Sequence, residues 1–313
     1  MHDKLYHALY RIRRVEEQVA AVYPTDKIKS PVHLSIGQES VSVGVCAALR
    51  PDDVVFGTYR SHALYLAKGG DLKAMIAELY GKATGCAKGK GGSMHLMAPR
   101  VHMMGTSAVV GTTIPHAVGY AYALKLQRRD AIVACFFGDG ATEEGVYYES
   151  LSFATLKKLP IIFVCENNGY AIHTHVLRRQ LSANLGERAR AFGLPVESIN
   201  DGDVLRIYER TKAMADTLRA GNAGPFFLEC ATYRWKEHVG PNDDFNLGYR
   251  TKEEMEPWRK TDQVLRLAGM VDPARRQQIE QQVEAEIADA FAFAEASPFP
   301  EPAELSTDVF KES

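Results

Sequence analysis

The sequence predicts an α/β protein built on a doubly wound, mostly parallel sheet, with helical additions at both ends. Two observations support this fold class. Short, continuous apolar runs alternate with helical segments between residues 131 and 234, and apolar runs without polar alternation are typical of strands covered on both faces. The chain has 313 residues, of which 46% are hydrophobic, enough for one large core or two modest ones.

The first part of the chain is predicted to be helical. Apolar side chains recur every three or four positions over residues 3–22, which predicts an amphipathic helix. A second helix is expected over residues 38–49. It ends at the Arg50-Pro51 pair, because the residue before a proline avoids the helical conformation. A third helix is expected over residues 71–81.

Residues 86–100 are predicted to form a long loop, because they are rich in glycine and basic residues and show no periodicity. Long loops inside compact domains are more often functional than idle. Beyond residue 108, a tight turn leads into a helix of small residues that extends to residue 126.

The central part of the chain supplies the predicted sheet. Its strands are expected at residues 131–137, 160–167, 195–199 and 225–234. Its helices are expected at residues 142–157, 184–192 and 203–220. This alternation is typical of parallel strands joined by helical crossovers.

A polar, irregular loop is predicted for residues 235–250, and a long amphipathic helix follows from the Asp272-Pro273 pair. A proline-rich segment after residue 297 is expected to lie along the surface. We therefore expect a single domain over residues 1–313, with an N-terminal helical segment (1–50) and a C-terminal helix and tail (262–313).

Composition narrows the function classes. The formal net charge is −2 and the isoelectric point is about 6.6, so nothing suggests a nucleic acid or a membrane surface as partner. No apolar run approaches the roughly 20 residues needed to span a bilayer, and the N-terminus lacks the apolar region of a secretory signal. The five cysteines form no CxxC pair, so we expect reduced, mostly buried thiols in a cytoplasmic protein.

Polar residues follow two successive predicted strands. Gly138-Asp139-Gly140 ends the first strand, and Asn168 follows the second, 29 positions after Asp139. If the strands are neighbours, as sequential strands usually are, these side chains share one edge of the sheet. A carboxylate and an amide oxygen suit magnesium, and glycines with a helix start near Ala141 would suit a phosphate. The alternative is ordinary turn and capping chemistry at each strand end.

The Gly-Asp-Gly and Asn-Asn pair, separated by 26 residues, resembles the thiamine-diphosphate motif. Most of the chain resembles the α subunit of the decarboxylating component of 2-oxo acid dehydrogenases, the pyruvate and acetoin dehydrogenase group. The matching blocks include HLSIGQES (33–40), TYRSHA (58–63), GKGGSMH (89–95), VVGTTIPHAVG (109–119), GDGATEEGVYYES (138–150) and LPIIFVCENNGYAI (159–172). The resemblance implies the thiamine-diphosphate-binding fold and a decarboxylating or acetoin-cleaving oxidoreductase.

The resemblance also implies a set of site residues. Asp139, Asn168 and the main-chain carbonyl of Tyr170 would bind Mg²⁺. Thiamine diphosphate would contact the residues Tyr59, Arg60, Ala108, Val110, Gly138, Asp139, Gly140, Ala141, Asn168, Tyr170 and His238. His33 and His238 would line the pocket near the substrate and act in catalysis. His62 and His95 would order nearby loops.

A partner chain is implied as well. In the family, the glutamate beside the cofactor's pyrimidine ring comes from a β subunit, and no such glutamate can be placed in this chain. The resemblance therefore implies an assembly of two α and two β subunits that is inactive without β. The substrate would be a small 2-oxo acid or acetoin, and the acceptor a lipoyl group on an acyltransferase partner.

The segment WKEHVGPNDDFNLGYR (235–250) departs from the family pattern. The family loop commonly has a His-Gly-His-Ser core, of which only His238 remains, and Val239 stands in place of the serine. We therefore expect no regulatory phosphorylation here, and an acceptor other than lipoyl becomes an alternative. His173 and His175 could be exposed loop residues or could read a more polar substrate. A stand-alone acyl- or acyloin-forming transferase and a non-catalytic partner subunit remain the rival interpretations.

Overall fold

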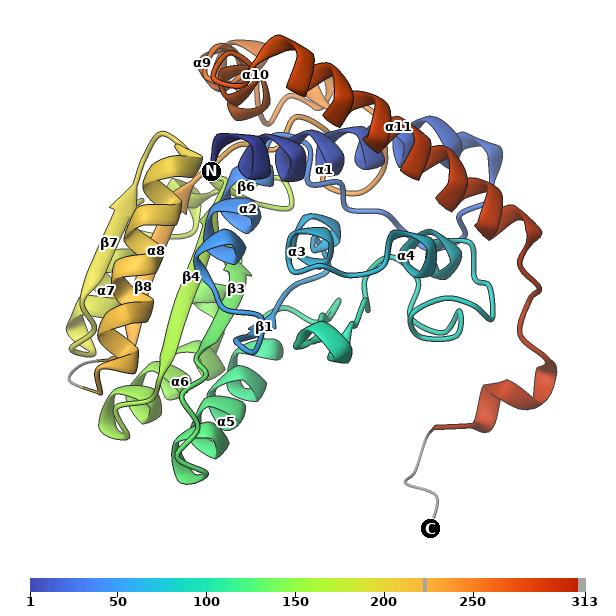
Figure 1. Ribbon diagram of the computed structural model, residues 1–313. Coiled ribbons are helices and arrows are strands. Elements are labelled where there is room, and N and C mark those ends of the chain that lie inside the picture. Colours follow the sequence, from blue (N-terminus) through green and yellow to red (C-terminus); the bar gives the residue numbers. More distant parts are fainter. Residues whose placement is uncertain (222–223, 309–313) are drawn as a thin grey trace.

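Six parallel strands form the central sheet of the computed structural model, which describes residues 1–221 and 224–308 (Figure 1). The strand order is β2-β1-β3-β4-β8-β7. The strands are β1 (Val54–Phe56), β2 (Met103–Gly105), β3 (Val133–Gly138), β4 (Ile161–Asn167), β7 (Val196–Ile199) and β8 (Phe226–Ala231). A separate two-stranded hairpin consists of β5 (Tyr170–Ala171) and β6 (Thr174–His175).

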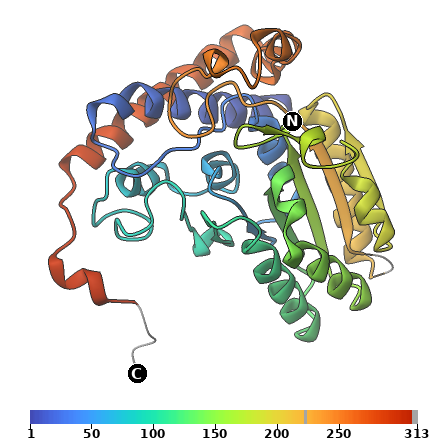
Figure 2. The ribbon, with the colours of Figure 1, turned by 180° about the vertical axis from the view of Figure 1, so that it is seen from behind.

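Helices cover both faces of the sheet (Figures 1 and 2). On one face, the core includes side chains of α1 (His2–Val22), α2 (Glu39–Ala48), α3 (His62–Ala67), α4 (Leu72–Leu79), α8 (Val204–Arg219), α10 (Gln263–Ala268) and α11 (Pro273–Ala296). The other packs against α5 (Thr113–Leu126), α6 (Gly145–Leu156) and α7 (Gly186–Ala191). The remaining helix, α9, spans Lys252–Lys260. The doubly wound, parallel fold predicted from the apolar runs is thereby confirmed.

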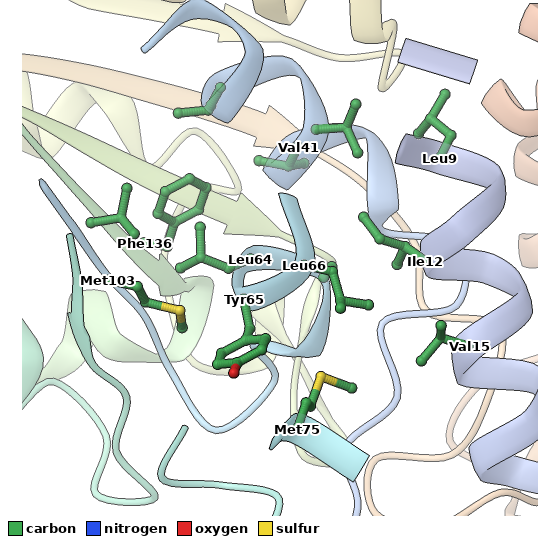
Figure 3. Close-up of a cluster of buried hydrophobic side chains, with 14 of the residues drawn as sticks. Leu9, Ile12, Val15, Val41, Leu64, Tyr65, Leu66, Met75, Met103 and Phe136 are labelled. Carbon is green, nitrogen blue, oxygen red and sulfur yellow. The ribbon is translucent and has the colours of Figure 1, made fainter. Parts of the chain in front are cut away.

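The sheet has one hydrophobic core on each face, and the pleat of the strands explains how each strand contributes to both. In β3, Ala134 and Phe136 enter the core beneath α1 to α4, whereas Val133, Cys135 and Phe137 enter the core beneath α5 and α6. Successive side chains of a strand point to opposite faces, so a strand buried on both sides must be apolar throughout. Figure 3 shows part of the first core, which contains Phe136 together with side chains of α1, α3 and α4.

Strands β3 and β4 are direct neighbours, in a register that pairs Gly138 with Glu166. Their carboxyl ends therefore lie side by side, as the site hypothesis requires. The next strand along the chain, β7, does not continue this order, because β8 lies between β4 and β7. Strands β1 and β2 were not predicted, since three residues each are too short to show a pattern.

The terminal helices α1 and α11 lie side by side across the top of the molecule in Figure 1. Ion pairs join them, including Arg11 to Glu286 at 2.6 Å and Arg14 to Glu284 at 2.7 Å. Among the helices of the described residues, none combines the length and apolarity needed to cross a bilayer. All five cysteines are free thiols, as predicted, and three of them are buried.

The segment after α11 turns back along the glycine-rich loop. In that loop, Lys88 and Lys90 both pair with Glu304, at 3.0 and 3.1 Å. The 3₁₀ helix η6 (Pro302–Ser306) carries Glu304. These ion pairs join the tail to the glycine-rich loop, and residues 309–313 lie outside the described part of the chain.

Candidate active site

A cavity of about 320 Å³ opens at the carboxyl ends of the central strands, within the size range of about 300–1,000 Å³ typical of ligand pockets. Its lining comes from the segments that follow β1, β2, β3, β4 and β8, together with the β5–β6 hairpin. In open parallel sheets, ligands bind at this edge. The predicted site residues that line the cavity are Tyr59, Arg60, Val110, Gly138, Asp139, Gly140, Ala141, Asn168, Tyr170 and His238.

The two remaining predicted residues stand just behind the lining. The His33 ring lies against Tyr59 and His238, with ring centroids 4.5 and 5.1 Å apart. Ala108 stands between Ser107 and Val109, both of which line the cavity. The structure thus gathers at one place residues that are spread over more than 200 positions of sequence.

Asp139 is buried at the end of β3, with 1% of its surface exposed. Burial raises the pKa of its carboxyl group, and the nearby guanidinium of Arg179 acts in the opposite direction. Asn168 is held by two hydrogen bonds. Its Oδ1 accepts from the Tyr170 N–H at 3.0 Å, and its Nδ2 donates to Gln38 Oε1 at 3.1 Å.

The two glycines beside Asp139 have different surroundings. A methyl group added at Gly138 would meet no protein atom within 4 Å, whereas one at Gly140 would come within 2.9 Å of Ala171 Cβ. Gly138 therefore leaves open space in the cavity, and Gly140 permits close packing against the hairpin.

The helix expected to begin near Ala141 differs from the prediction. Residues Asp139–Glu143 form a short 3₁₀ helix, η3, and α6 begins at Gly145. Glu144 breaks the helical path with an extended backbone conformation. The α-helix therefore begins four residues later than expected, and its N-cap residue, Glu144, lines the cavity.

Arg60 and the two histidines form a compact group opposite Asp139. Arg60 donates to the Leu34 and His238 carbonyl oxygens at 2.7 and 3.0 Å, and it lies 3.3 Å from His238 Nδ1. Because a guanidinium only donates, Nδ1 must accept and the proton of the neutral ring lies on Nε2.

Both histidines of this group are neutral at physiological pH. Burial, with the positive charge of Arg60, lowers the pKa of His33 to about 2 and that of His238 to about 3. Burial also lowers the pKa of Arg60 to about 10, which leaves the guanidinium charged. The group therefore offers the cation of Arg60 and the neutral imidazole of His238 to the cavity, with the neutral ring of His33 packed behind them.

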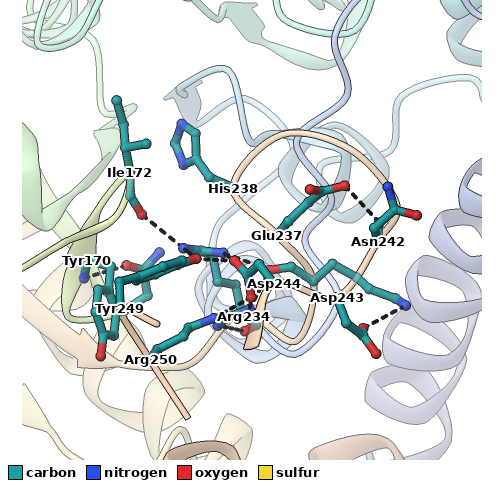
Figure 4. A network of polar contacts seen from close by, with 12 residues as sticks. Tyr170, Ile172, Arg234, Glu237, His238, Asn242, Asp243, Asp244, Tyr249 and Arg250 are labelled. Carbon is teal, nitrogen blue, oxygen red and sulfur yellow. Dashed lines mark hydrogen bonds and ion pairs between the residues drawn. The ribbon is translucent and has the colours of Figure 1, made fainter. Parts of the chain in front are cut away.

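His238 is presented by a loop that closes on a buried ion-pair network (Figure 4). The Asp244 carboxylate pairs with Arg250 at 2.5 Å and Arg234 at 3.1 Å, and it accepts a hydrogen bond from Tyr249. Arg234 also donates to the Ile172 carbonyl at 2.9 Å, which ties this loop to the β5–β6 hairpin. The loop was predicted as irregular, which is confirmed, but its buried arginines were not foreseen.

The glycine-rich loop near the cavity is organised by one buried carboxylate. Glu78 accepts four backbone N–H groups, from Ala87, Gly89, Gly91 and Gly92, at 2.7 to 3.1 Å. His62 bridges Glu16 on α1 at 3.1 Å and Ser93 in the loop at 2.8 Å, so its predicted loop-ordering role agrees with the structure.

The other histidines singled out from the sequence lie at the surface. His95 is exposed. His173 is also exposed and stacks on Tyr249 with ring centroids 4.5 Å apart. His175 accepts a hydrogen bond from the Leu177 N–H at 3.2 Å. Among the described residues, neither His173 nor His175 belongs to the cavity lining.

The cavity residues that were not predicted from the sequence include Gln38, Glu166 and Arg179. Burial raises the pKa of Glu166 to about 7, and Arg60 opposes that rise. Glu166 could have been singled out from the sequence, because it is an ionisable residue within the apolar run of β4. Arg179 carries no comparable signal, because it stands 40 positions after Asp139 in a segment without a motif.

The donor atoms around Asp139 suit a hard cation. The side chains of Asp139 and Asn168 and the Tyr170 backbone offer oxygen ligands, as Mg²⁺ prefers, and Mg²⁺ usually needs only one or two protein carboxylates beside phosphates and water. Across residues 1–221 and 224–308, no group of three or more His, Cys, Asp or Glu side chains is placed to hold a metal. A metal here would therefore depend on amide, carbonyl and phosphate oxygens.

Comparison with known proteins places this geometry in a family. A model of the dehydrogenase E1 component family matches residues 7–303. The α subunit of acetoin:2,6-dichlorophenolindophenol oxidoreductase from Bacillus subtilis is 36% identical, over 98% of this chain and 92% of that protein. Subunit α of the pyruvate dehydrogenase E1 component from Zymomonas mobilis is 37% identical, over 98% of this chain and 87% of that protein.

The similarity extends to eukaryotic relatives. The somatic mitochondrial α subunit of the pyruvate dehydrogenase E1 component from Rattus norvegicus is 35% identical, over 98% of this chain and 79% of that protein. Together with the family match over residues 7–303, these similarities establish that the chain belongs to the dehydrogenase E1 component family.

Proposed function

We propose that the chain is the α subunit of a thiamine-diphosphate-dependent E1 component that acts on a small 2-oxo acid or on acetoin. One observation carries the proposal. Asp139 and Asn168 stand at the ends of the adjacent strands β3 and β4 and line one cavity, in a chain of the E1 family. When bound, thiamine diphosphate supplies the electron sink that allows carbon dioxide to leave a 2-oxo acid.

In this proposal Asp139, Asn168 and the Tyr170 carbonyl hold Mg²⁺, and the open space at Gly138 admits the diphosphate. The same diphosphate would contact Tyr59, Arg60, Gly140 and Ala141. Backbone atoms of Ala108 and Val110 would meet the aminopyrimidine, and the Val110 side chain would support the bent cofactor. These assignments rest on the family resemblance and on the shared cavity.

The histidines act as neutral hydrogen-bonding groups in this proposal, because the pKa values of both lie far below neutrality. His238 would offer its Nε2–H to the substrate, since its Nδ1 faces Arg60. His33, wedged against Tyr59 and His238, would orient them.

We further propose that a β subunit completes the site. Val109, Val110 and Ile172 line the cavity yet are 63%, 42% and 56% exposed, and exposed apolar side chains grouped at a cavity are typical of a surface that a partner covers. The similar proteins are named as α subunits, which supports an assembly of two α and two β chains.

Turnover measured with and without the β subunit tests this proposal. We expect the α chain alone to reduce 2,6-dichlorophenolindophenol with pyruvate or acetoin at background rate, and the α and β chains together to reduce it with thiamine diphosphate and Mg²⁺ present. Full turnover by the α chain alone would contradict the need for β. No turnover of any 2-oxo acid or acetoin by the reconstituted pair would favour a non-catalytic role.

The natural acceptor is a separate part of the proposal. In the loop that presents His238, Lys236 pairs with Asp243 at 3.2 Å, and Glu237 Oε1 accepts the Asn242 N–H at 2.9 Å. These contacts replace the family's His-Gly-His-Ser chemistry. We propose a lipoyl group on an acyltransferase as the acceptor. Dye reduction without transfer to a lipoyl domain would instead favour an acyl- or acyloin-forming enzyme.

Gly138→Ala tests whether the diphosphate lies against the turn. The backbone of Gly138 has φ −82° and ψ 166°, which alanine adopts freely, and its methyl group would meet no protein atom within 4 Å. We expect unchanged or slightly higher stability, but about tenfold weaker binding of thiamine diphosphate, because the methyl group would crowd the ligand.

Gly140→Ala is the matched control for protein packing. Its methyl group would approach Ala171 Cβ to 2.9 Å, so this variant should lose stability in urea denaturation by about 1–3 kcal/mol. Wild-type cofactor affinity in Gly138→Ala would show that the diphosphate lies elsewhere.

A further inference from the structure

Arg179 is a cavity residue that the family motif does not account for. It follows the β5–β6 hairpin, and its side chain is 10% exposed. Its Nη2 pairs with Asp139 Oδ2, its Nη1 pairs with Glu143, and its Nε donates to the Thr174 carbonyl at 3.0 Å. One guanidinium therefore spans both carboxylates of the η3 turn at the floor of the cavity.

The side chain is anchored independently of Asp139. The contacts with Glu143 and the Thr174 carbonyl fix two of its nitrogen atoms, and Gln180 holds Glu143 by donating to it at 2.9 Å. Removing the contact with Asp139 would therefore leave the guanidinium in the cavity with a free Nη2–H donor. A planar guanidinium so placed is well suited to bind a phosphate oxygen.

The negative charge of the cavity explains why a second guanidinium is needed beside the diphosphate. The cavity lining contains four carboxylates, those of Asp139, Glu143, Glu144 and Glu166, and only two arginines, Arg60 and Arg179. Arg60 already donates to the Leu34 and His238 carbonyls. A diphosphate beside Asp139 and Glu143 would meet like charge. Mg²⁺ would offset the charge of Asp139, and Arg179 offsets that of Glu143, with which it pairs.

We propose that Arg179 is a diphosphate-binding residue that changes partner when a divalent cation binds. Without the metal, its guanidinium neutralises the buried Asp139 carboxylate. With the metal on Asp139, the guanidinium remains on Glu143 and the Thr174 carbonyl and turns its free donor to the diphosphate. This inference rests on the proposed function and adds a residue that the family motif does not supply.

The proposal predicts two shifts of opposite sign in Arg179→Ala. Mn²⁺ alone should bind more tightly than to wild type, because a competing cation has been removed from Asp139. Inorganic pyrophosphate in the presence of Mg²⁺ should bind roughly 10- to 100-fold more weakly, because a charge-assisted hydrogen bond is lost. A residue that merely supports the fold would weaken both ligands together.

Matched variants complete the experiment. Arg178→Ala removes the same charge one position away, from an exposed side chain that forms no ion pair within the described part of the chain, and both affinities should remain as in wild type. Arg179→Lys keeps the charge and should recover much of the pyrophosphate affinity. Both ligands are titrated calorimetrically into the full-length chain, with thermal unfolding as a check on folding.

The outcomes separate this inference from the proposed function. Unchanged pyrophosphate affinity in Arg179→Ala, or weaker binding of both Mn²⁺ and pyrophosphate, would overturn the role of Arg179. If wild type itself binds Mg²⁺ and pyrophosphate no better than Asp139→Asn does, the proposed cofactor site fails, whatever the arginine does.

Discussion

Asp244→Asn is expected to destabilise the protein by about 3–5 kcal/mol, because it removes the only carboxylate of a buried network and leaves two arginines without their counter-charge. The Asp244 and Arg250 side chains are fully buried, and that of Arg234 is 1% exposed. Urea denaturation followed by circular dichroism measures the loss. Enzymatic activity should fall as well, since the same loop presents His238 to the cavity.

Asp243→Asn is the matched control. Asp243 is the preceding residue, and its side chain is 57% exposed in an ion pair with Lys236. Exposed pairs contribute about 0–1 kcal/mol, so this variant should stay close to wild type. Similar losses in both variants would show that the network does not stabilise the loop through charge.

The same network gives stability a defined pH dependence. Burial by itself would raise the pKa of Asp244, but hydrogen bonds from Tyr249, Arg250 and Arg234 hold the pKa below its usual range. A depressed carboxyl pKa contributes stability above the unfolded value of about 3.9, and that contribution is lost as the pH falls through the folded value. The difference between wild type and Asp244→Asn should therefore shrink below about pH 4.

Asp139→Asn is expected to abolish Mg²⁺-dependent cofactor binding while the fold persists. The substitution keeps the size of the side chain and removes the charge from the only carboxylate in the proposed metal site. Loss of a residue that merely supports a metal ligand weakens binding about 10- to 100-fold, so loss of the ligand itself should exceed about 100-fold. Calorimetry measures the affinity, and thermal unfolding confirms that the variant is folded.

The central sheet could be predicted because its middle strands carry apolar side chains on both faces. The same feature located the site, since Asp139 and Asn168 interrupt that apolarity where β3 and β4 end. Strands β1 and β2 could not be predicted, because three residues each carry no periodicity. Their position is fixed only by pairing with distant strands, which local sequence does not encode.

The buried arginines could not be predicted from local sequence for a different reason. Arg234 and Arg250 flank a polar segment, which is ordinarily exposed. Their burial depends on the Asp244 carboxylate and on backbone carbonyls that the fold brings to them. Arg179 reaches Asp139 because the two-residue strands of the β5–β6 hairpin reverse the chain. Strands of that length leave no pattern by which this approach could have been foreseen.

The most direct test of the account is a calorimetric titration of thiamine diphosphate into the α chain combined with its β partner, with Mg²⁺ and after its removal by chelation. We expect saturable binding that requires Mg²⁺ in wild type and is lost in Asp139→Asn. Equal binding with and without Mg²⁺, or equal binding by wild type and Asp139→Asn, would contradict the assignment of this cavity as the thiamine-diphosphate site.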